Sequence, residues 1–116
     1  MRIYDQQDAE GRVISFEISN LLISRSGVCA VAETVPGALV IERPRPFMRT
    51  ADDEFCEFEV DGQRFKAWEP FGDNSRYWIG PVPTRWCPQT EAVRAAFAAH
   101  TPVITSVQRF FGAGKP

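Results

Sequence analysis

The chain has 116 residues, of which 44% are hydrophobic and 24% charged, and its formal net charge at pH 7 is −2. This length predicts a single domain over residues 1–116 with enough apolar residues for a core. The weak negative charge argues against general binding of nucleic acid or of anionic membranes. No segment approaches the roughly 20 consecutive apolar residues that a membrane helix needs.

The three cysteines are Cys29, Cys56 and Cys87. They lack the close spacing of zinc ligands, and an odd number in a short chain is a poor disulfide framework. Two of them lie within apolar patterns, which predicts small buried thiols. The first residues contain no apolar stretch of the kind found in a secretory signal. These features predict a cytoplasmic protein that holds no metal and no other cofactor.

The first third of the chain alternates between strand and helix patterns. Residues 1–12 are polar and form either a short edge strand at Arg2–Tyr4 or a loose arm, whereas residues 13–18 alternate as a strand does. Apolar residues at helical spacing then predict a helix over about residues 20–34. Gly27 inside it indicates a break, after which Ser24 or Ser26 caps a second piece.

Two further segments lie between this helix and the middle of the chain. Residues 38–42 form a short apolar strand after Pro36-Gly37, which ends the helix. Residues 43–49 are extended, because prolines cannot pair in a central strand. Their Arg43, Arg45 and Arg49 form either a solvated edge or a contact for an anion or an acidic peptide.

The turn at Asp61-Gly62 specifies a hairpin, because a type I′ turn needs a positive φ at both central residues. A two-residue turn sets the register and pairs Phe58 with Phe65, and Phe55 with Trp68. Alternation then separates two faces. The predicted core face carries Cys56, Phe58, Val60, Phe65 and Ala67. The other face carries Phe55, Glu57, Glu59, Arg64, Lys66 and Trp68, with Glu57 opposite Lys66 and Glu59 opposite Arg64.

The last part of the chain predicts one strand and two helices. A polar loop at residues 70–75 leads into a strand at residues 76–79, and a proline-rich connector with Trp86 follows. Thr90 begins a helix that reaches His100. Thr101-Pro102 begins a final helical segment, and residues 112–116 form a frayed tail.

The order of these elements is β-α-β-β-β-β-α-α. It predicts an α+β fold with a mostly antiparallel, four- to five-stranded sheet and helices packed on one face.

The sequence contains no pattern typical of catalysis. With His100 as the one histidine, no nucleophile–base pair that uses histidine and no multi-histidine metal site exists. Phosphate-loop and nucleophile-elbow motifs are absent as well. The acidic residues 52–54 are more typical of a solvated loop than of a cation site. We therefore predict no catalytic residue and no metal ligand, which favours a protein other than an enzyme.

Two stretches, residues 18–29 with the Val35-Pro-Gly37 that closes them, and residues 68–79, are similar to small proteobacterial proteins of uncharacterised families. Some such proteins resemble the immunity proteins of contact-dependent-inhibition and other polymorphic toxin systems. The resemblance covers roughly residues 13–80 and implies a protein that neutralises a cognate bacterial toxin. It assigns no binding residue.

Two functions of different classes are consistent with these residues. The favoured one is a non-catalytic protein-binding module that uses the charged sheet face, where aromatic side chains and Arg inside a polar rim are typical of binding hot spots. The alternative is a small-ligand-binding or enzymatic domain that uses the loop at residues 70–76 and nearby arginines. A terminal helix or the Trp86 connector covering the face is a further alternative. The predicted partner-binding residues are Phe55, Lys66, Trp68, Asp73, Asn74, Arg76 and Trp78.

Overall fold

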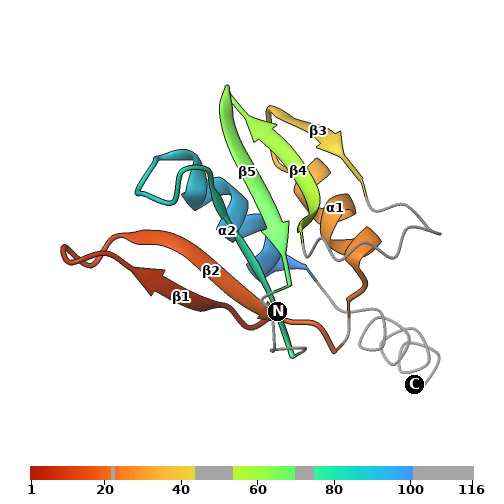
Figure 1. The fold of residues 1–116 in the computed structure, drawn as a ribbon, viewed down its shortest axis with the longest axis horizontal. Coiled ribbons are helices and arrows are strands. Elements are labelled where there is room, and N and C mark those ends of the chain that lie inside the picture. The colour runs from red at the N-terminus through yellow and green to blue at the C-terminus, as the bar shows by residue number, and fades with distance from the viewer. Residues whose placement is uncertain (22, 44–53, 70–74, 101–116) are drawn as a thin grey trace, which may run out of the picture.

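A computed structural model describes residues 1–21, 23–43, 54–69 and 75–100 (Figure 1). Within these ranges a six-stranded antiparallel sheet carries two helices on one face, in the strand order β1-β2-β6-β5-β4-β3. The predicted α+β class is confirmed, and the sheet is larger than the four to five strands expected. The elements are β1 (Tyr4–Gln7), β2 (Val13–Ser19), α1 (Arg25–Glu33), β3 (Ala38–Glu42), β4 (Glu54–Val60), β5 (Gln63–Trp68), β6 (Arg76–Pro81) and α2 (Gln89–Ala99).

The sheet gains its extra strand from the N-terminal residues. Of the two alternatives for residues 1–12, the edge strand is the one that forms, and it lies at Tyr4–Gln7 rather than Arg2–Tyr4. The Arg94 guanidinium of α2 donates to both carboxylate oxygens of Asp5, at 2.7 and 2.9 Å. The Met1 ammonium donates to the carbonyl oxygens of Ala98 and His100 at the end of α2. These contacts join β1 and the N-terminus to α2, about 90 to 100 residues further along the chain.

Helix α1 begins later than the sequence pattern predicts. Ser24 is its N-cap, and its hydroxyl accepts a hydrogen bond of 3.0 Å from the Gly27 amide. The helix that forms is therefore the second of the two pieces predicted from the break near Gly27, with Ser24 as its cap. Leu21, which was predicted on the buried stripe, precedes the helix and is 81% exposed. The cap therefore outweighs apolar spacing in deciding where the helix starts.

The core lies between the sheet and the two helices. Four phenylalanines in it are fully buried, and the stacked rings of Phe58 and Phe65 lie 5.3 Å apart in adjacent strands. On α2, Phe97 packs against Phe16 of β2 with ring centroids 5.7 Å apart. The strand register confirms the predicted pairing of Phe58 with Phe65. The two-residue turn sets this register, and alternation then places both rings on the helix side.

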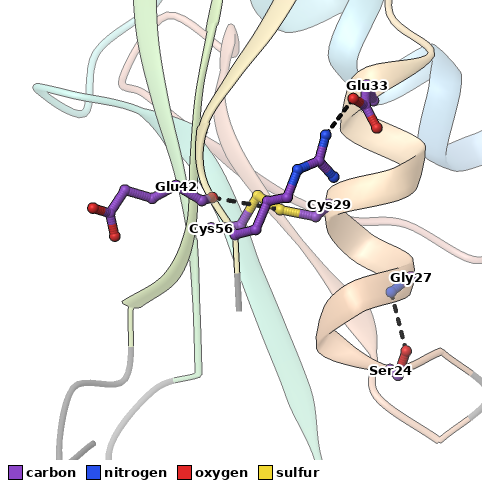
Figure 2. The surroundings of a disulfide bond; sticks show 7 residues. Ser24, Gly27, Cys29, Glu33, Glu42 and Cys56 are labelled. Atoms are coloured by element: carbon purple, nitrogen blue, oxygen red, sulfur yellow. Dashed lines mark hydrogen bonds and ion pairs between the residues drawn. A yellow bond between two sulfur atoms is a disulfide. The ribbon is translucent and has the colours of Figure 1, made fainter. Parts of the chain in front are cut away.

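A disulfide joins Cys29 of α1 to Cys56 of β4 (Figure 2), with the two Cα atoms 6.0 Å apart. The prediction of buried free thiols is therefore wrong for these two residues, whereas Cys87 is free and buried. Spacing along the chain could not show the pair, because the helix brings together positions that are 27 residues apart. Disulfides are rare in a reducing cytoplasm, so the cysteines no longer argue for that location. Neither described helix is long and apolar enough to cross a membrane.

The hairpin turn gives a first testable result. Asp61 and Gly62 have φ values of 49° and 83°, as a type I′ turn requires. A Cβ at position 62 would meet no atom within 4 Å, so a substitution there tests the backbone alone. Gly62→Val is expected to lower the free energy of unfolding by about 1–3 kcal/mol through strain at positive φ. Urea denaturation measures this loss.

Gly62→Asn serves as the matched control, because asparagine tolerates the left-handed region better than valine does. It should retain most of the stability. Equal losses in the two variants would mean that the strain at Gly62 is not what the turn depends on.

Candidate binding surface

The sheet has one face without a described helix, which we call the outer face; both helices lie on the opposite side (Figure 1). Directly paired residues share a face, so the strand registers identify its members. From β1 to β3 they are Tyr4, Gln6, Ser15, Glu17, Ser19, Arg76, Trp78, Gly80, Arg64, Lys66, Trp68, Glu54, Glu57, Glu59, Leu39 and Glu42.

Two tryptophans occupy the middle of the outer face. Trp68 of β5 and Trp78 of β6 are directly paired, and their ring centroids lie 5.7 Å apart at an interplanar angle of 36°. Both side chains are half-buried, so part of each ring is accessible. The structure thus places four of the predicted contact residues on one face: Lys66, Trp68, Arg76 and Trp78.

Phe55 was predicted opposite Trp68, and this pairing is wrong. A β-bulge between Glu54 and Cys56 pairs Glu54 with Trp68 instead. The extra residue turns Phe55 to the helix side, where it is 6% exposed and its ring lies 5.0 Å from that of Tyr77. In the sequence, the one sign of this bulge was that a large apolar side chain, Phe55, was predicted on a charged face.

The side chains around Phe55 also hold the start of α1. The Arg25 guanidinium lies 5.0 Å above the Phe55 ring, and its Nη2 is 2.5 Å from a carboxylate oxygen of Glu69. Burial raises the pKa of the Tyr77 hydroxyl, and the charge of Glu69 acts in the same direction. Phe55 is therefore part of a core contact between α1 and the ends of β5 and β6. Its ring is therefore not exposed on the outer face.

Two other predicted contact residues, Asp73 and Asn74, lie outside the described residues, as do Arg45 and Arg49. Arg43 forms an ion pair with Glu33 of α1.

Arg76 is held in place by three outer-face residues that the sequence did not indicate. Its guanidinium lies 3.7 Å from the centre of the Tyr4 ring and 3.5 Å from a carboxylate oxygen of Glu17. The Gln6 amide donates to the other Glu17 oxygen at 2.5 Å, and Glu17 is only 8% exposed. Tyr4 and Gln6 come from β1, whose pairing with β2 could not be read from the polar N-terminal residues.

Gly80 allows β2 and β6 to approach closely beside the tryptophans. A Cβ at this position would lie 2.7 Å from the Cβ of Ser15 in β2. The Ser15 hydroxyl is buried and has no hydrogen-bond partner among the described residues. A side chain at position 80 would therefore collide with Ser15, and glycine avoids this collision.

The other half of the outer face is rich in carboxylates. The predicted register, with Glu57 opposite Lys66 and Glu59 opposite Arg64, is confirmed. The Arg64 guanidinium lies 3.8 Å from Glu59, directly opposite, and also binds Glu57 diagonally, whereas the Lys66 ammonium lies 2.5 Å from Glu54, also on a diagonal. Diagonal neighbours on a sheet are within reach of long side chains.

The described ranges carry aromatic and charged side chains on the outer face and a histidine on the helix side. No group of three or more His, Cys, Asp or Glu side chains in them is arranged to hold a metal ion. His100 follows α2 on the helix side and lines an apolar hollow with alanines of that helix. The aromatic and charged side chains of the outer face, in contrast, come from all six strands of one sheet.

The chain was compared with protein-family models, curated proteins and solved structures, and none of these matches it.

Proposed function

We propose that the protein is a non-catalytic binding module that recognises another protein through the outer face of its sheet. The observation that carries the proposal is the half-buried Trp68–Trp78 pair beside Arg76, on the face opposite the helices. Trp and Arg are enriched among the few residues that dominate binding energy in protein interfaces. The ion pairs around them form the polar rim that such interfaces have.

The construction of the face supports recognition by a preformed surface. Arg76 is held by Tyr4 and Glu17, so little side-chain entropy is lost when it is bound. The two tryptophans stand on adjacent hydrogen-bonded strands. Two segments are similar to small proteobacterial proteins, some of which resemble immunity proteins, and this similarity supports a bacterial toxin domain as the class of partner, with the chain acting as its inhibitor.

Trp68→Ala tests the proposal. The measurement is calorimetric titration of the protein with the product of a toxin-like gene adjacent to its own. We expect the variant to lose about 2 kcal/mol or more of binding free energy, which is roughly a 30-fold rise in Kd. Because the Trp68 ring is only partly buried, its loss should cost less folding stability than the roughly 3–5 kcal/mol typical of a buried aromatic residue.

Leu21→Ala is the matched control, because Leu21 is also a large exposed apolar residue and lies outside the sheet. Its Kd should equal that of the unchanged protein. Full binding by Trp68→Ala and by Trp78→Ala would show that the outer face is not the contact surface.

A further inference from the structure

The edge of the sheet at β3 differs from the edge at β1. In Figure 1, β3 is the outermost strand beside β4, and no other described strand pairs with it. The Ala38 amide donates to the Val35 carbonyl, and the other outward backbone groups of β3 face no described strand, so they can pair with an added strand. The β3 edge also exposes apolar side chains, with Leu39 61% and Ile41 42% exposed. The β1 edge, in contrast, is polar.

A cavity of about 260 Å³ lies next to this edge and is lined mainly by charged side chains. We call it the edge cavity; its lining residues are Glu42, Glu54, Phe55, Cys56, Glu57 and Lys66. Glu42 stands directly opposite Glu57 in the register, and like charges so placed destabilise a sheet. Figure 2 shows the Glu42 carboxylate pointing away from the disulfide and α1.

The nearby cations are already bound to other carboxylates. Arg43 binds Glu33 on α1, Lys66 lies 2.5 Å from Glu54, and Arg64 binds Glu57. Within the part of the chain that the structure describes, no ion pair reaches Glu42. A cation supplied from outside would relieve its repulsion with Glu57.

We infer that an extended, basic segment of the protein partner pairs with β3 as an additional strand and places a Lys or Arg side chain in the edge cavity. This inference rests on the proposed protein-binding function and names the chemistry of the partner. Strand addition supplies affinity through the backbone, and the pockets beside the edge supply specificity. A second copy of the chain does not fit as well, because β3 has the sequence ALVIE and carries no cation.

The test uses two synthetic heptapeptides that alternate valine with lysine or valine with glutamate. Nuclear magnetic resonance of the full chain, labelled with nitrogen-15, reads the amide shifts and the hydrogen exchange of each strand. The lysine peptide is expected to shift the amides of Ala38–Glu42 and slow their exchange. The glutamate peptide should leave them unchanged.

Glu42→Gln is expected to raise the Kd of the lysine peptide about two- to fivefold, the usual effect of losing one partly exposed ion pair. Glu91→Gln, which removes an exposed carboxylate on α2, is the control and should change the Kd little.

Three outcomes would overturn the inference. The first is equal binding of both peptides, and the second is shifts at Trp68 and Trp78 without any at β3, which leaves the proposed function standing. The third is a concentration-dependent change at β3 without peptide, which would identify a second copy as the occupant.

Discussion

Reduction of the Cys29–Cys56 disulfide is expected to lower the free energy of unfolding by about 3–4 kcal/mol. The bond closes a loop across a sequence separation of 27, and a cross-link of this span restricts the unfolded chain by about that amount. It also holds α1 against β4 from within the core, since both cysteines are buried. Urea denaturation with and without a reducing agent measures the difference.

The double variant Cys29→Ala, Cys56→Ala separates the disulfide from other effects of the reducing agent. Its stability should be low in both conditions and should not respond to reduction. Cys87→Ala is the second control, because this buried cysteine is free and its variant should keep the full response. If reduction leaves the free energy of unfolding of the unsubstituted protein the same, the disulfide does not stabilise the fold.

Phe55→Ala is expected to destabilise the fold by about 3–5 kcal/mol, the usual cost of truncating a buried aromatic residue. The β-bulge places this ring on the helix side, against Tyr77 and under the Arg25 guanidinium. Without the bulge, Phe55 would stand on the outer face, and its truncation would change stability by only about 0.5 kcal/mol. Chemical denaturation therefore decides between the two registers.

Phe58→Ala and Leu39→Ala are the two reference variants, one for a buried and one for an exposed side chain. Phe58 is fully buried in the same strand, whereas Leu39 is 61% exposed on the neighbouring strand. Phe55→Ala should resemble the first of these variants. A result close to that of Leu39→Ala would contradict the bulge and return Phe55 to the outer face.

The two outer-face proposals are distinguished by position. The Trp68–Trp78 pair lies in the middle of the sheet, whereas the edge cavity lies near the edge that β3 forms. A partner that uses both would lose affinity separately on Trp68→Ala and on Glu42→Gln. The effects should be nearly additive if the sites are independent.

The sequence by itself determined the hairpin and its immediate consequences. Asp61-Gly62 requires a turn with positive φ, and the two-residue length of that turn sets which residues face each other. Phe58 and Phe65 therefore reach the core together, and Lys66 and Trp68 reach the outer face. The α+β class followed in the same way, because the order of strand and helix patterns is a local property.

Only the tertiary structure decided the rest of the surface. The bulge at Phe55 forms where the ring packs against Tyr77 of β6, a contact that no hairpin pattern contains. The disulfide depends on α1 lying across β4, and the Arg76 cluster depends on β1 pairing with β2. Each feature joins residues that are far apart in the chain. Their proximity is therefore decided by packing between elements rather than by local propensity or alternation.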